Sequence, residues 1–221
     1  MRSRATVTIS RLLLGIGLLA GLSGAAAPPP AKQNNADIFA GFVQDDGYKA
    51  YLLQAYNGTE PAPLKAKCPA LKIIGLAPPE VIKPPSFVKT GDAFRIAGGA
   101  WVARGLLNRC GTEVIRRLVV EGVPQTGGLH AITLIPGQFP GNLPLEKTAT
   151  HIVLPPSMAA ARCADFKKLY VLDTRLTSPA NPKGWTETWT MQACGRMVTA
   201  DVTYVADRTG MKVTAKNVKL H

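Results

Sequence analysis

The feature that most constrains the fold of this chain is a pattern that occurs twice. "WVARGLLNRCGTEV" runs from Trp101 to Val114, and "WTETWTMQACGRMV" runs from Trp185 to Val198. Both stretches begin with tryptophan, have Cys-Gly from the tenth position and end in valine. Because this order of several features is shared, a tandem duplication is the simplest origin of the two stretches.

Further matched segments extend the pattern in both directions. "AKCPALK" at 66–72 corresponds to "ARCADFK" at 161–167, and "QTGGLHAITL" corresponds to "RTGMKVTAKN" with a one-residue gap. Two copies predict a pseudo-symmetric protein rather than a solenoid, which needs at least three repeats.

The second copy determines the predicted secondary structure of both. "WTETWTMQAC" alternates large side chains with polar ones, as a half-buried strand does. "MVTADVTYVAD" alternates in the same way, and "DRTG" at 207–210 has the chemistry of a hairpin turn. We therefore expect a mainly β protein, in which two homologous four-stranded antiparallel units form a sandwich or a small barrel. The segments "AGGAW" and "QTGGLH" are expected to be turns, and the runs around His130 and His151 to be strand-like.

Four segments follow from this organisation. Residues 1–25 have the charged, apolar and small-residue order of a signal peptide, although an uncleaved anchor is an alternative. Residues 26–63 are predicted to be an extended leader followed by a short helix, because Tyr48, Leu52 and Tyr56 recur at helical spacing. Residues 64–140 and 141–221 are the two predicted β repeats.

The charge of the chain favours anionic partners. The formal net charge is +12, and it falls to +9 when the three arginines of the predicted signal peptide are removed. Lipopolysaccharide, other anionic envelope polymers and extracellular nucleic acid are attracted to such a surface, but no pattern indicates specific nucleic-acid recognition. The basic residues are scattered, so a charge that only keeps the protein soluble is the alternative.

The cysteines predict two disulfides and an oxidising compartment, either a periplasm or the extracellular space. Cys68 opens the first strand of copy one and Cys110 closes the second, and Cys163 and Cys194 stand likewise in copy two. Antiparallel neighbours would therefore bring Cys68 to Cys110 and Cys163 to Cys194. A swapped arrangement, Cys68 with Cys194 and Cys110 with Cys163, is the alternative.

No catalytic, cofactor-binding or metal-binding motif is present. None of the serines lies in a GxSxG sequence, and the three histidines are not spaced as metal ligands. The sequence consequently predicts no catalytic residue, no cofactor and no metal.

Two places are candidates for a binding surface. The first is Pro84, Pro85 and Phe87 in "APPEVIKPPSF", which we expect to be an extended loop inserted into copy one. The second is Glu187 with Trp189, an acid that shares a strand face with tryptophans.

These observations favour a non-enzymatic, exported β module, stabilised by disulfides, that binds an envelope macromolecule or serves as a structural component. A hydrolase of envelope polymers that uses Glu187 and a histidine is one alternative. An inhibitor of a secreted enzyme is another. The sequence does not determine the oligomeric state.

Overall fold

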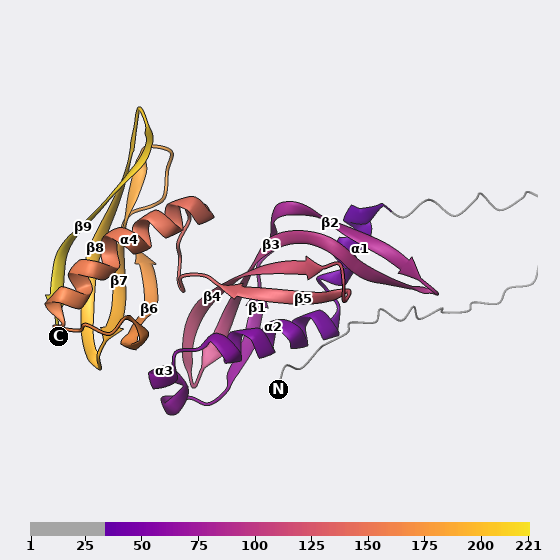
Figure 1. Cartoon of the computed structure of the whole chain (residues 1–221), viewed down its shortest axis with the longest axis horizontal. Coiled ribbons are helices and arrows are strands. Elements are labelled where there is room, and N and C mark those ends of the chain that lie inside the picture. The colour runs from indigo at the N-terminus through magenta and orange to yellow at the C-terminus, as the bar shows by residue number, and fades with distance from the viewer. Residues whose placement is uncertain (1–33) are drawn as a thin grey trace, which may run out of the picture. The chain divides into compact units, whose positions relative to one another are not determined.

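A computed structural model describes residues 34–221, so the predicted signal peptide lies outside the described residues. The protein is mainly β, with two antiparallel sheets and a short helical segment at the start of the described chain (Figure 1). The helices are α1 (Asn35–Phe42), α2 (Asp46–Thr59), α3 (Ala62–Lys67) and α4 (Leu143–Ala160), and a 3-10 turn spans Phe166–Lys168.

The first sheet has five strands, β1 (Leu71–Leu76), β2 (Glu80–Thr90), β3 (Ala93–Arg109), β4 (Thr112–Val123) and β5 (Gly128–Thr133). Their order is β1-β3-β4-β5, and β2 also pairs with β3. β3 is long enough to pair with β1 near Arg109 and with β2 near Ala93. The strands do not close into a barrel.

The second sheet is a four-stranded meander of β6 (Leu169–Leu176), β7 (Gly184–Ala193), β8 (Arg196–Asp207) and β9 (Gly210–Leu220). On β8, buried and more exposed residues alternate as predicted, since Val198, Ala200, Val202 and Tyr204 are all buried. Helix α4 packs on the same face, where Ala149, Val153 and Met158 join one apolar cluster with these strands. One face of this sheet is therefore covered by a helix.

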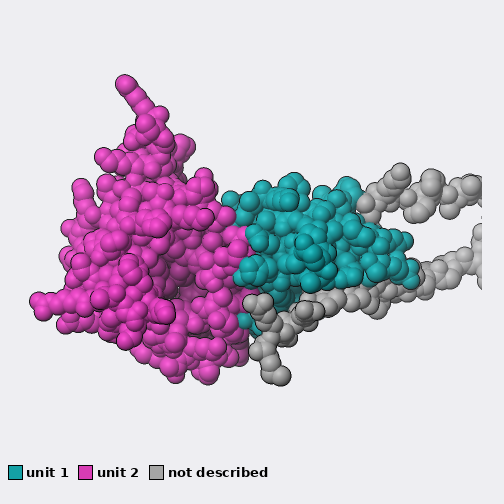
Figure 2. All heavy atoms as spheres, viewed as in Figure 1, with its two compact units in different colours: residues 1–54, 79–102, 120–131 teal, residues 55–78, 103–119, 132–221 magenta. Residues whose placement is uncertain are grey.

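The described chain divides into two compact units, coloured separately in Figure 2. The first comprises the chain up to residue 54 together with 79–102 and 120–131, and its core is an aromatic cluster around Trp101. The second comprises 55–78, 103–119 and 132–221, and it holds both disulfides and the whole second sheet.

The two halves of the chain share local irregularities that a duplication predicts. Cys110-Gly111 and Cys194-Gly195 both form tight turns at positive φ, with values of 47° and 89° in the first turn and 48° and 82° in the second. β1 and β6 both carry an irregularity, where the pairing register shifts between Ile73 and Gly75 and between Val171 and Asp173. Ile73 and Val171 pair with Leu107 and Met191, which stand three positions before these turns. The boundaries 64–140 and 141–221 remain a prediction.

The segment around Pro84 is a strand and not the expected loop. β2 pairs with β3 from Glu80 to Thr90, but the register shifts on both sides of Pro84-Pro85. Proline lacks a backbone N–H and is tolerated at such bulges of an edge strand. Gly98 and Gly99 likewise lie inside β3 and not in the expected turn. Their missing side chains leave space for Pro85 and Ser86 of β2.

Helix α4 was not predicted, and it places His151 on a helix and not in a strand. Its start has ordinary helix signals, since Asn142 accepts a hydrogen bond from the Leu145 N–H and a proline follows in the first turn. The apolar run "THIVL" before Pro155-Pro156 contains β-branched residues, which favour a strand, and the sequence therefore predicted a strand there. Burial against the second sheet stabilises the helix despite its prolines.

Candidate functional site

Glu187 lies in the centre of the second sheet, on its covered face. Its carboxylate accepts hydrogen bonds from Trp185 Nε1 and Trp189 Nε1, both at 2.8 Å, and from the Tyr204 hydroxyl at 3.3 Å. The residue is 1% exposed. Burial raises the pKa of Glu187, and the three hydrogen bonds only partly oppose this.

This geometry corrects the second candidate surface. Glu187 and Trp189 are enclosed and cannot form an exposed platform for a ligand. Alternation on β7 correctly placed them on one face, but that face is the core, where the carboxylate joins two indoles and a phenol. A buried acid is tolerated there because both of its oxygens have donors.

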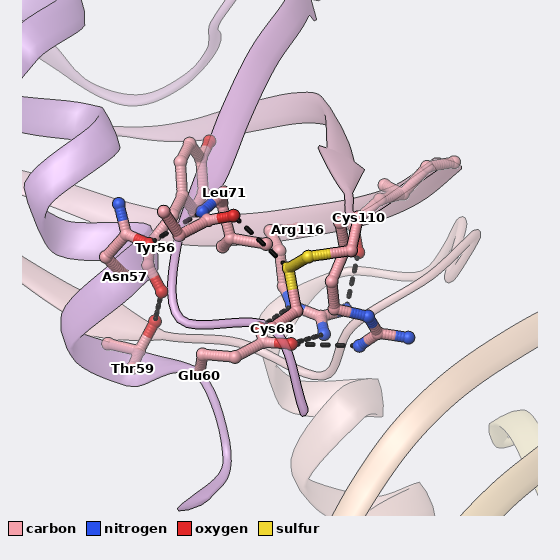
Figure 3. A network of polar contacts seen from close by, with 11 residues as sticks. Tyr56, Asn57, Thr59, Glu60, Cys68, Leu71, Cys110 and Arg116 are labelled. Carbon is pink, nitrogen blue, oxygen red and sulfur yellow. Dashed lines mark hydrogen bonds and ion pairs between the residues drawn. A yellow bond between two sulfur atoms is a disulfide. The ribbon is translucent and has the colours of Figure 1, made fainter. Parts of the chain in front are cut away.

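A second buried carboxylate lies beside the first disulfide (Figure 3). Glu60 accepts a bidentate pair of hydrogen bonds from Arg116 and a third from Arg109, each at 2.9 Å. Burial alone would raise the pKa of Glu60, but the hydrogen bonds from Arg116 and Arg109 lower it overall. This group therefore holds the end of α2 against β3 and β4 in its charged form.

A third buried pair joins β4 to α4. Arg117 Nη1 donates to Glu146 at 2.9 Å, and its guanidinium lies 5.4 Å from the centre of the Phe139 ring. Both side chains are buried, and Glu146 also accepts the Ile135 N–H. The pair links an element of the first predicted copy to one of the second.

The disulfides are Cys68–Cys110 and Cys163–Cys194, which is the pairing expected within each copy. Each bridge attaches the segment after a helix to the tip of a hairpin. The closed loops span 42 and 31 residues, and each bridge stabilises the fold by ~3–4 kcal/mol in the chain-entropy description.

The residues of the first candidate surface, Pro84, Pro85 and Phe87, differ in their exposure to solvent. Pro84 is exposed, Pro85 is buried against Gly99, and Phe87 packs half-buried against Phe42. Pro84 borders a shallow groove of about 360 Å³ in the first unit. Its lining comprises Lys83, Pro84, Ser86, Ala97, Gly98, Gly99, Ala100, Glu121, Gly122 and Pro124. One cation, one anion and a floor of small residues give this groove no strong charge preference.

The other face of the second sheet is mostly polar and partly exposed. Strand alternation and the pairing registers place on it every residue that faces away from the Trp185–Tyr204 core. We call this surface the threonine face. It comprises Tyr170, Asp173, Arg175, Thr186, Thr188, Thr190, Gln192, Met197, Thr199, Asp201, Thr203, Val205, Lys212, Thr214, Lys216 and Lys219.

Two corresponding positions of the first copy, both on β4, are covered. Alignment at the shared Cys-Gly turns matches Arg117 with Asp201 and Val119 with Thr203. Arg117 and Val119 are buried, whereas Asp201 is exposed and Thr203 is half-buried. At these two positions β8 is thus more exposed than β4, and the threonine face is mostly polar.

Lysines concentrate at one edge of the threonine face. Lys212, Lys216 and Lys219 lie on the edge strand β9, are exposed, and take part in no ion pair with the described residues. Asp201, the nearest acid by register, instead accepts hydrogen bonds from Thr188 and Asn217. The face carries four basic and two acidic side chains, a net excess of positive charge.

This surface is not predicted from the amino-acid sequence. The signal was present in "MKVTAKNVKL", where lysine and threonine alternate with apolar residues, but the scattered basic residues showed no cluster. The sheet brings β7, β8 and β9 side by side, and only then do their polar positions become one surface.

Metal and membrane sites are not indicated in residues 34–221. That range holds no group of three or more His, Cys, Asp or Glu side chains able to bind a metal ion. No helix in the same range is long and apolar enough to span a bilayer.

No known protein family, no curated protein and no solved structure matches this chain.

Proposed function

We propose that the protein is an exported, non-enzymatic binding module that holds an anionic polymer of the cell envelope on its threonine face. The observation that carries this proposal is the edge of Lys212, Lys216 and Lys219, which are exposed and have no ion-pair partner among the described residues. Lysine ammonium groups on an open surface attract carboxylate and phosphate groups as point charges.

The disulfides and the N-terminal sequence support export. Two disulfides favour an oxidising compartment, because cytosolic thiols are kept reduced. The charged, apolar and small-residue order of residues 1–25 is that of a secretory signal. An exported protein meets the anionic polymers of the envelope directly.

The buried acids support a binding role over a hydrolytic one. Glu187 and Glu60 have both carboxylate oxygens occupied by donors of the protein itself. A general acid or base must reach the substrate directly or through one water. Each of these carboxylates instead serves as a structural hydrogen-bond acceptor.

The test is binding to immobilised lipopolysaccharide over a range of salt concentrations. The triple variant Lys212→Gln, Lys216→Gln, Lys219→Gln should lose most of the affinity at low salt. The Debye length falls from about 10 Å at 0.1 M salt to about 3 Å at 1 M, so wild-type affinity should fall steeply over this range.

The matched control is Lys89→Gln, Lys147→Gln, Lys167→Gln, which removes the same charge from exposed lysines elsewhere. It should retain binding within a few fold. Equal losses in both triple variants would assign the attraction to net charge and contradict a role for the threonine face.

A further inference from the structure

The hydroxyl groups of the threonine face form an ordered array. Thr186 pairs with Thr203, which pairs with Thr214, so three hydroxyls form a row across β7, β8 and β9. Thr190 pairs with Thr199 in a second row that ends at Lys219. Neighbouring strands lie about 4.8 Å apart, and alternate residues on one strand lie about 6.7 Å apart. The array is regular across β7 and β8, and a bulge shifts the register between β8 and β9 at Thr199 and Asp201.

Three of the hydroxyls on this face are occupied by internal hydrogen bonds. Thr186 Oγ1 lies 2.7 Å from Thr177 Oγ1, Thr188 Oγ1 donates to Asp201 at 3.2 Å, and Thr199 Oγ1 lies 2.8 Å from His221 Nε2. These contacts fix three hydroxyl positions.

The hydroxyls of Thr190, Thr203 and Thr214 make no side-chain hydrogen bond to any residue of the described chain. They are not among the buried unpaired atoms either, so solvent satisfies them. Each hydroxyl can donate one hydrogen bond and accept others. A ligand that replaces this water must offer both donors and acceptors.

Sugar hydroxyls have this dual character, and nucleobases are a poor fit. Binding of single-stranded nucleic acid depends on aromatic side chains that stack on the bases. The threonine face has one aromatic residue, Tyr170, while Trp185, Trp189 and Tyr204 are buried on the opposite face.

We propose that the ligand of the threonine face is an acidic polysaccharide, whose sugar hydroxyls bind Thr190, Thr203 and Thr214 and whose carboxylates lie along the lysine edge on β9. This inference rests on the proposed function and specifies its ligand. The lysines supply a salt-dependent part of the affinity, and the threonines supply a part that persists at high salt.

The test compares Thr190→Val, Thr203→Val, Thr214→Val with the matched Thr→Ser triple variant at the same positions. Valine keeps the shape and strand preference but removes the hydroxyl, whereas serine keeps the hydroxyl. Polygalacturonate oligosaccharide is the probe, titrated by calorimetry at low and high salt. Thermal unfolding of both variants checks that the fold is retained.

The Val variant should bind about tenfold more weakly or worse, with an unchanged salt dependence, and the Ser variant should stay within a few fold of wild type. In the triple variant Lys212→Gln, Lys216→Gln, Lys219→Gln, the affinity should instead depend less on salt concentration than in the wild type. A single-stranded oligonucleotide of equal charge should bind more weakly than the polysaccharide at high salt.

Wild-type affinity in the Val variant would overturn the inference while leaving binding of an anionic polymer intact. Tighter binding of the oligonucleotide, with a loss on Tyr170→Ala, would also overturn it. Absence of binding to polygalacturonate, oligonucleotide and lipopolysaccharide at low salt would contradict the proposed function itself.

Discussion

Glu187 illustrates how one polar residue can organise a core. Its two carboxylate oxygens accept from two indoles and a phenol, all of them buried, and the Trp185 and Tyr204 rings stack on each other. The corresponding residue of the first copy is Ala103, where the Tyr56 hydroxyl donates to the backbone carbonyl instead. A residue that suggested a ligand platform in the sequence is therefore an internal acceptor that fixes Trp185 and Trp189.

Glu187→Gln should lower the free energy of unfolding at neutral pH by ~1–3 kcal/mol. The amide carbonyl can still accept from one indole, but the amide nitrogen then faces another N–H donor. Urea unfolding followed by tryptophan fluorescence measures the loss. Glu113→Gln, an exposed site on β4, is the control and should change stability by less than ~0.5 kcal/mol.

The same variant has an expected pH dependence. Because burial raises the folded-state pKa of Glu187, its contribution to stability is complete below the unfolded-state pKa and is lost as pH rises through the folded-state value. Glutamine does not titrate, so the stability difference between wild type and variant should narrow as pH rises. A difference that widens with rising pH would contradict the raised pKa.

Close approach between backbones decides the geometry of β2 and β3. Gly99 has a φ of 110°, and a Cβ at this position would lie 2.5 Å from the Pro85 Cα. Pro85 is buried there, at the bulge where the pairing register shifts. The "AGGA" segment and the Pro-Pro segment, which are separate in the sequence, are thus two sides of one contact.

Gly99→Ala should destabilise the protein by ~1–3 kcal/mol more than Gly91→Ala. Gly91 also has a positive φ, of 62°, but a Cβ there meets no atom within 4 Å, so it is a control for a positive φ without a close contact. Chemical unfolding of both variants gives the comparison. Equal losses would mean that β2 moves away from Gly99 at no cost.

At the scale of the whole molecule, the pair Arg117–Glu146 connects the two predicted copies. Arg117 belongs to β4 and Glu146 to α4, and both are buried. The segment between them is also held in place, because the Leu134 N–H donates to the Arg117 carbonyl and the Thr174 hydroxyl donates to the Pro136 carbonyl. The connection is thus a set of specific polar contacts.

Arg117→Met and Glu146→Gln should each lower the free energy of unfolding by ~3–5 kcal/mol, because each leaves a buried group without its partner. The double variant should lose clearly less than the sum of the single losses. A double-mutant cycle by urea unfolding measures this coupling. Additive losses would show that the pair contributes no interaction energy.

The local features of the fold could be predicted from the amino-acid sequence. The repeated Trp and Cys-Gly positions gave the strands from Trp101 and Trp185, and antiparallel neighbours implied the Cys68–Cys110 and Cys163–Cys194 bridges, which the structure contains. These inferences succeeded because alternation and hairpin turns are local properties, and because each copy constrained the interpretation of the other.

Which faces of the strands are buried and which are exposed depends on how the folded elements pack. Alternation placed Glu187 with Trp189 on one face but could not say that α4 would cover it. Proline made β2 and α4 hard to predict, since a bulge or a burying sheet compensates for a missing N–H only after the chain has folded. The threonine face exists only because pairing of β7, β8 and β9 gathers dispersed side chains, and pairing between strands is a long-range property.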